Sequence, residues 1–126
     1  HPSEIRAPLS AARARYGKRN LWAVFQPHTY SRTEALLEDF AGSFSDADHV
    51  IVTEIYAARE HAERDRGISG AQIVAKIKQR DARFIAGLEE CAEFLANRLQ
   101  SGDVLITLGA GDVNLVGTMI AQRRGE

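Results

Sequence analysis

Four short apolar runs alternate with longer amphipathic segments along the chain, and this alternation constrains the fold more than any other feature. The apolar runs are residues 21–25, 49–53, 83–86 and 104–108. Helical spacing of apolar residues marks the segments at about 3–16, 31–44, 69–77, 88–99 and 113–122. Strands that alternate with helices form βαβ units with right-handed crossovers. We therefore predict an α/β fold, a three-layer Rossmann-like domain with a mainly parallel sheet.

Size and charge limit the class of protein. A chain of 126 residues supports one domain, 1–126, and is too short for two ordinary ones. Its net charge of −1 provides no overall field that would recruit nucleic acid or an anionic membrane surface. No apolar run approaches the roughly 20 residues that span a bilayer, and we expect neither a nucleic-acid nor a membrane partner. The single cysteine, Cys91, excludes an internal disulfide, which fits a cytoplasmic protein with this thiol in its core.

The ends of several segments also carry predictions. Ser3 is the expected N-cap of the first helix, and Gly17 its expected end. Pro8 predicts either a kink or a helix that becomes regular only from that residue. Ser69 is a candidate cap for a later helix. The strongly polar residues 58–67 read as an exposed, mobile loop.

Polar or glycine-rich turns follow three of the four predicted strands, at 26–32, 54–60 and 109–112. The carboxyl ends of parallel strands share one edge, where open α/β sheets bind ligands. In the first turn, His28 and Arg32 are four residues apart where a helix begins. They form either a cationic anchor for a carboxylate or phosphate, or a turn histidine beside a surface arginine.

The third turn contains Gly109, Gly111 and Asp112. The glycines allow the backbone to approach a ligand or a neighbouring domain closely. They form no dinucleotide fingerprint, because the third glycine position is Asn114, and no P-loop, because no Gly-Lys-Ser/Thr follows. Asp112 is the expected N-cap of the last helix.

The remaining charged residues indicate no complete catalytic machinery. Arg59 and Glu60 either neutralise each other on a solvated loop or contribute to the site. His49 is expected to be structural and His61 solvated, and the four histidines lack metal-ligand spacing, so we expect no metal site. No nucleophile elbow or Cys–His pair at family spacing is present.

Four segments, taken together, resemble the C-terminal domain of the Mur ligase family, and its alanine-adding members most closely. These segments are residues 1–6, 25–33, 55–60 and 109–113. The resemblance extends along the whole chain in the same order, and the segment Phe-Gln-Pro-His-Thr-Tyr-Ser-Arg-Thr is the most specific. His1 matches a histidine that follows an Asp-Asp-Tyr-Gly-His run in the family. We therefore expect this chain to be part of a longer, three-domain enzyme.

The resemblance implies an ATP-dependent ligase of peptidoglycan synthesis that joins L-alanine to UDP-N-acetylmuramate through an acyl phosphate. It implies that ATP and magnesium are bound mainly by a central domain, and the UDP-sugar by an N-terminal domain. The C-terminal domain closes over the active site and helps to bind the amino acid. By motif match, the substrate-binding residues are His1, His28, Tyr30, Arg32 and Arg59, with Arg32 as the clamp for a carboxylate or phosphate.

One departure and three alternatives accompany this interpretation. Many members of the family carry arginine where this chain has Thr29, and others carry threonine, so a second cationic contact is either missing or comes from elsewhere, for which Arg59 is the candidate. The domain alone is expected to be folded but inactive. The alternatives are a sister ligase that adds a preformed peptide to the same sugar nucleotide, a free-standing α/β module that binds an anionic metabolite, and an interaction-only domain.

Overall fold

A four-stranded, entirely parallel sheet forms the centre of the computed structural model, which describes residues 1–57, 68–78 and 81–125. The strands are β1 (Leu21–Phe25), β2 (His49–Val52), β3 (Asp81–Phe84) and β4 (Val104–Leu108). Their order across the sheet is β3-β2-β1-β4. The predicted α/β class with a parallel sheet is confirmed.

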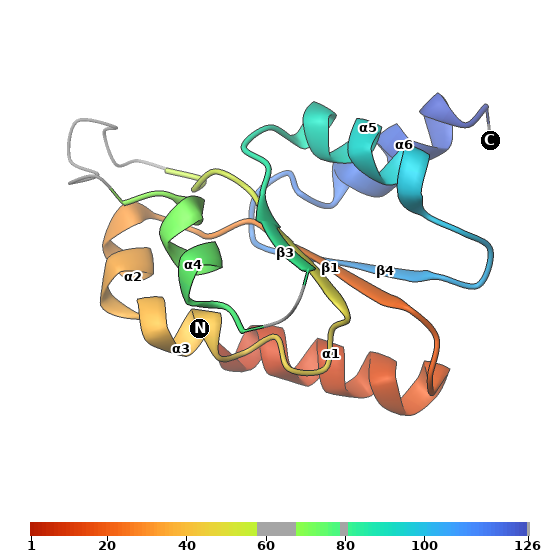
Figure 1. Ribbon diagram of the computed structural model, residues 1–126. Helices are drawn as coiled ribbons and strands as arrows, with labels where there is room; N and C mark the ends of the chain where they lie inside the picture. The colour runs from red at the N-terminus through yellow and green to blue at the C-terminus, as the bar shows by residue number, and fades with distance from the viewer. Residues whose placement is uncertain (58–67, 79–80, 126) are drawn as a thin grey trace.

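Helices cover both faces of the sheet and complete the three layers. They are α1 (Ser3–Tyr16), α2 (Tyr30–Ala35), α3 (Leu37–Ala41), α4 (Gly70–Lys76), α5 (Leu88–Arg98) and α6 (Leu115–Arg123). Figure 1 shows α1 to α4 on one side of the sheet, and α5 and α6 on the other. No helix of the described residues is long and apolar enough to cross a membrane.

The core consists of two apolar clusters separated by the sheet. All five residues of β1 are buried, and they alternate between the clusters because successive side chains of a strand point to opposite faces. One cluster joins Phe25 to Leu9 of α1 and Ile73 of α4. The other joins Val24 to α5 and α6, and it contains the buried Cys91, as predicted. A strand buried on both faces reads as a continuous apolar run, which is why its bounds were predictable.

Two predicted elements differ from the structure. The helix predicted over 31–44 is instead two short helices, α2 and α3, interrupted at Leu36, whose φ is −116°. Leu36 and Leu37 pack against the core, so tertiary packing and not a glycine or proline sets this break. The third strand begins two residues before its predicted start, because Asp81 pairs with His49 in the sheet register. An edge strand tolerates the charged side chains that concealed this start.

The helix ends also refine the predictions. Ser3 is the first residue of α1 and not its N-cap, which is Pro2. The helix is continuous from Ser3 through Pro8, which excludes one of the two alternatives predicted for Pro8, a helix that becomes regular only from that residue. Gly17, at φ 63°, ends it as predicted. Ser69 caps α4 in a capping box with Gln72, also as predicted, while residues 58–67 lie outside the described part of the chain.

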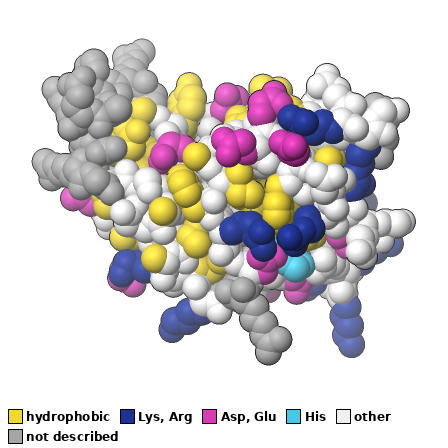
Figure 2. All heavy atoms as spheres, turned by 45° about the horizontal axis from the view of Figure 1, so that its top comes forward, with side chains coloured by type: hydrophobic (Ala, Val, Ile, Leu, Met, Phe, Trp, Pro, Cys, Tyr) yellow, Lys and Arg dark blue, Asp and Glu magenta, His cyan; other side chains and the backbone are white. Residues whose placement is uncertain are grey.

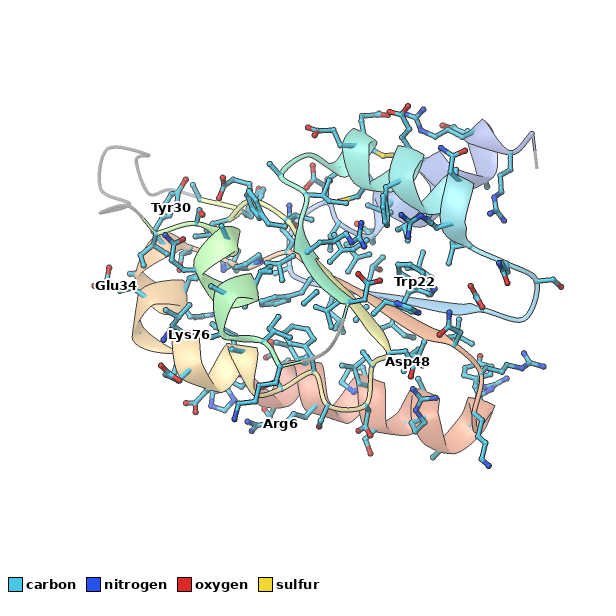
Figure 3. All side chains as sticks on the ribbon, in the orientation of Figure 1. Arg6, Trp22, Tyr30, Glu34, Asp48 and Lys76 are labelled. Atoms are coloured by element: carbon cyan, nitrogen blue, oxygen red, sulfur yellow. The ribbon has the colours of Figure 1, made fainter. Side chains whose placement is uncertain are left out.

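Polar side chains close the amino end of the sheet. His49 stacks on Trp22, with ring centroids 3.9 Å apart, and its ring nitrogens lie 2.7 Å from Asp81 and 2.9 Å from Asn20. The predicted structural role of His49 fits this arrangement. Asp48, which Figure 3 labels, lies at the same end, and its carboxylate accepts a hydrogen bond from the Leu21 N–H over 2.8 Å. On the face that Figure 2 shows, acidic and basic side chains are interspersed with apolar ones.

Candidate functional site

The three predicted turns, which follow β1, β2 and β4, begin side by side at the carboxyl edge of the sheet. Phe25 pairs with both Val52 and Leu108, so β1, β2 and β4 end together. A pocket of about 280 Å³ opens at this edge. Among the residues that line it are His1, His28, Arg32 and Gly109, which the sequence had singled out. The expected convergence of these residues on one site is therefore present in the fold.

The turn after β1 and the segment after β2 are joined through Tyr56. The Tyr56 N–H donates to the Pro27 carbonyl, and the Thr29 N–H donates to the Tyr56 carbonyl, each over 2.8 Å. The rings of His28 and Tyr56 are stacked, with centroids 5.7 Å apart and an interplanar angle of 15°. Tyr56 is 42% exposed, so it covers one face of His28 while staying in contact with solvent.

Thr29 directs the start of α2 and thereby the position of Arg32. Its φ is 63°, a left-handed value that is unusual for a residue other than glycine. The Thr29 hydroxyl accepts a hydrogen bond from the Arg32 N–H over 3.4 Å, and the Thr29 carbonyl accepts one from the Thr33 hydroxyl over 2.7 Å. These contacts place the exposed Arg32 in the first turn of α2, at the rim of the pocket.

The helix that carries Arg32 is shorter than expected, and this changes the electrostatic argument. α2 has six residues, and aligned peptide dipoles in so short a helix add little to the attraction of an anion. The positive charge that the turn after β1 brings to the pocket is therefore that of the Arg32 guanidinium. His28 and Arg32 both line this pocket, and their role as a cationic anchor stays a prediction.

Gln26 connects the turn after β1 with the turn after β4. The residue is buried, at 6% exposed, and its side-chain Nε2–H donates to Asp112 Oδ1 over 3.0 Å. The prediction that Asp112 is the N-cap of the last helix is wrong. α6 begins later, at Leu115, and its N-cap residue Asn114 makes no side-chain cap hydrogen bond.

The two glycines of the turn after β4 are required by close packing. A Cβ on Gly109, whose φ is 149°, would lie 2.8 Å from the carbonyl oxygen of Gln26. A Cβ on Gly111 would lie 2.5 Å from Gln26 Oε1 and 3.0 Å from the Tyr56 ring. The backbone of this turn approaches Gln26 and Tyr56 closely, whereas the predicted approach to a ligand or a neighbouring domain stays a prediction.

His1 and Glu4 bring the start of α1 to the pocket. The Nδ1 atom of His1 accepts a hydrogen bond from the Ser3 N–H over 3.2 Å and lies 3.0 Å from the Ser3 hydroxyl. Both His1 and Glu4 are exposed, and both line the pocket. The pocket wall therefore contains the Arg32 guanidinium and also the Glu4 carboxylate, which suits a ligand that carries charges of both signs.

The structure does not place the other two predicted site residues, Tyr30 and Arg59, at the pocket. Tyr30 is the first residue of α2, where Figure 3 labels it, but it does not line the pocket. Arg59 lies outside the described residues, so its place at the site stays a prediction. Within residues 1–57, 68–78 and 81–125, no group of three or more His, Cys, Asp or Glu residues is arranged to hold a metal ion.

Sequence reasoning did not assign roles to Gln26, Tyr56 or Glu4. Gln26 and Tyr56 both lie in turns that the sequence marked as polar, and this position is the only sequence signal that pointed to them. Their contacts with Asp112, His28 and Gly111 cross between loops, and no local spacing predicts such contacts.

Comparisons with known proteins agree on one family. The model of the family described as Mur ligase, glutamate ligase domain, matches residues 1–111. A UDP-N-acetylmuramate–L-alanine ligase from Alkaliphilus metalliredigens is 50% identical over 122 residues, which are 95% of this chain and 26% of that protein. The corresponding ligase from Acetivibrio thermocellus is 48% identical over 122 residues, with 94% and 25% coverage. The chain thus spans about a quarter of the length of these relatives.

Solved structures give the same result. The crystal structure of UDP-N-acetylmuramate–alanine ligase from Thermotoga maritima matches with a TM-score of 0.77 and 25% identity, over 99% of this chain and 25% of that one. A domain of a peptide-adding muramate ligase from Haemophilus ducreyi matches with a TM-score of 0.70 and 20% identity, over 98% of this chain and 83% of that one. The second likeness supports the fold alone.

Proposed function

The chain belongs to the Mur ligase family, and we propose that it is the C-terminal domain of a three-domain ligase that joins L-alanine to UDP-N-acetylmuramate. In this proposal the domain closes over the active site and helps to bind the amino acid. The alanine-adding relatives, 50% and 48% identical to this chain, favour that substrate over a preformed peptide.

The observation that carries the proposal is the pocket at the carboxyl edge of the sheet, which His28 and Arg32 line. A guanidinium grips a carboxylate through two parallel hydrogen bonds, a geometry that a single ammonium cannot match. We assign Arg32 to the carboxylate of alanine, with His28 beside it. Held in this way, the amino acid keeps its amine free for attack on the activated carboxyl group of the sugar nucleotide.

The reaction itself requires groups from outside this chain. ATP supplies the phosphoryl group that activates the lactyl carboxylate of UDP-N-acetylmuramate. The alanine amine then bonds to that carboxyl carbon, phosphate leaves, and the amine loses a proton. This domain would contribute orientation of alanine, exclusion of water on closure, and positive charge near the developing oxyanion.

ATP and Mg²⁺ are assigned mainly to the central domain. The donor set of this chain agrees with that assignment, since its described residues offer no metal-binding cluster and its third turn is not a P-loop. We also propose a cytoplasmic enzyme, with His1 near the hinge to the central domain and Arg59 as a further cationic contact.

The test is a ligation assay on the complete reading frame that contains this chain. Phosphate release from ATP should require both UDP-N-acetylmuramate and L-alanine, and a tripeptide should not replace alanine. The 126-residue chain alone should show no ligation. Dependence on the tripeptide would favour the sister ligase, and activity of this chain alone would contradict the assignment of ATP to another domain. Absence of any ligation, with weak binding of phosphate or carboxylates, would favour an anion-binding module.

A further inference from the structure

We propose that Gln26 is a positioning residue that holds the loop 109–112 in the shape that completes the amino-acid pocket. The inference rests on the proposed function, because it concerns the same pocket. Gln26 itself lines the pocket, and the role assigned to it here is exerted through the loop.

Gln26 contacts the loop 109–112 and the strand before it through both its backbone and its side chain. Its N–H donates to the carbonyl of Leu108 over 2.9 Å, which continues the pairing of β1 with β4. Its side-chain Nε2–H donates to Asp112 Oδ1 over 3.0 Å. Between these two anchors, Gly109 and Gly111 pack so closely on Gln26 that neither has room for a Cβ. The loop is therefore shaped against this one residue.

The second amide atom of Gln26 points to a role other than stability. Gln26 Oε1 is buried and has no hydrogen-bond partner in the described part of the chain. A buried acceptor without a partner opposes folding, and an apolar side chain of similar size would avoid that penalty. Since folding alone does not favour glutamine here, the Nε2–H bond to Asp112 is the feature that distinguishes Gln26 from methionine.

Loss of that bond would affect the pocket directly. Asp112 is exposed, so its carboxylate would be hydrated in place of bonding Gln26, and the loop would lose its outer anchor. Gly109 and Ala110 of this loop line the pocket together with Arg32. A displaced loop would leave Arg32 in place but change the wall that faces it, so that binding of the amino acid weakens.

The experiment compares three variants in the full-length ligase. Gln26→Met keeps the volume and removes the bond to Asp112. Asp112→Ala removes the same bond from the loop side and leaves Gln26 in place. Ser43→Ala is the matched control, because Ser43 is also a buried polar residue, bonded to the Asp39 carbonyl on α3, away from the pocket.

Gln26→Met should raise the KM for L-alanine about tenfold, with kcat changed less than about threefold. Its midpoint of urea unfolding should equal or exceed that of the wild type, because the unpartnered acceptor is removed. Asp112→Ala should raise the KM by the same factor, to within about threefold, because it removes the same bond. In NMR spectra of the 126-residue chain, the amide signals of Gly109 and Gly111 should shift in both Gln26→Met and Asp112→Ala and stay unchanged in Ser43→Ala.

A wild-type KM in Gln26→Met would overturn the inference. So would a lowered urea midpoint of Gln26→Met with KM and kcat changed together, or a wild-type KM in Asp112→Ala, since either result would leave the bond without a role in shaping the pocket. Failure of the proposed function has a different signature: the full-length protein would not ligate alanine, whereas the glycine amide shifts, measured without any ligase activity, would still test the positioning of the loop.

Discussion

The imidazole of His28 lies nearly parallel to the phenol ring of Tyr56, with 5.7 Å between the ring centroids. Two backbone hydrogen bonds of Tyr56, to Pro27 and from Thr29, fix this stack from the side of the neighbouring strand. The orientation of a pocket-lining residue after β1 is thus set by a residue that follows β2.

Replacement of Tyr56 by alanine should release His28 and weaken binding of the amino acid. A stacked ring pair contributes about 0.5–1.5 kcal/mol, which corresponds to roughly a two- to tenfold rise in the KM for alanine. Tyr56→Phe retains the ring and the backbone bonds and is the matched control, with a KM near that of the wild type. Steady-state kinetics of the full-length ligase measure both. Equal KM values for the alanine and phenylalanine variants would show that the stack does not position His28.

Two glycine substitutions should change stability in opposite directions. A Cβ on Gly70 would collide with the Thr53 carbonyl and the Phe84 ring, so Gly70→Ala should lower the free energy of unfolding by about 1–3 kcal/mol or more. Gly117 lies within α6 with open space around its Cβ position, so Gly117→Ala should raise that free energy by up to about 1 kcal/mol. Urea denaturation of the 126-residue chain tests the pair, and a shift of the same sign in both variants would contradict this packing.

Cys91 should be unreactive in the folded chain. Burial raises the pKa of its thiol to about 12, and the charge of Glu90 adds to the rise, so almost no thiolate forms at neutral pH. Labelling with iodoacetamide at pH 8 should be slow in buffer and fast in 6 M urea, as mass spectrometry would show. Rapid labelling of the native chain would place Cys91 outside the core between α5 and α6.

Acid should destabilise the fold partly through Asp48. Partial burial alone would raise the pKa of this carboxyl, but hydrogen bonds from the Arg13 side chain and the Leu21 N–H, together with the Arg13 charge, lower it below the ordinary value of 3.8. A depressed pKa in the folded state stabilises the fold above pH 3.8, and this stabilisation is lost as the pH falls through the folded-state pKa.

The measurement is urea denaturation of Asp48→Asn between pH 7 and pH 3. The variant should be less stable than the wild type at pH 7, and the difference should shrink toward pH 3. Glu93→Gln, which removes an exposed carboxylate from α5, is the control and should leave both values nearly unchanged. A constant difference between Asp48→Asn and the wild type at all pH values would exclude the carboxylate as its source.

The parts of the fold that were predictable depend on burial, and the others on tertiary contacts. β1, in the interior of the sheet, and β4, at its edge, appear at their predicted bounds because each is a continuous apolar run in the sequence. The break at Leu36 was not predictable, since no local signal accompanies it. The early start of β3 at Asp81 depends on its pairing with His49, which lies 32 residues earlier in the chain.

The site, like the fold, was predictable in part. The rule that ligands bind at the carboxyl ends of parallel strands was enough to bring His28, Arg32 and Gly109 to one pocket. The bond between Gln26 and Asp112 spans 86 residues of sequence, and its existence depends on how two loops pack. Asp112 was predicted to cap a helix because aspartate before an apolar segment usually does so, and here a buried amide binds it instead.

The most direct test of the central claim is the KM for L-alanine of Arg32→Ala in the full-length ligase. A charge-assisted hydrogen bond is worth about 1.5–3 kcal/mol, so its loss should raise that KM, or lower kcat, by roughly tenfold or more. Arg15→Ala, which removes an exposed arginine from the opposite end of α1, should leave both parameters unchanged. Kinetics of Arg32→Ala that match the wild type would contradict the assignment of this pocket to the amino-acid carboxylate.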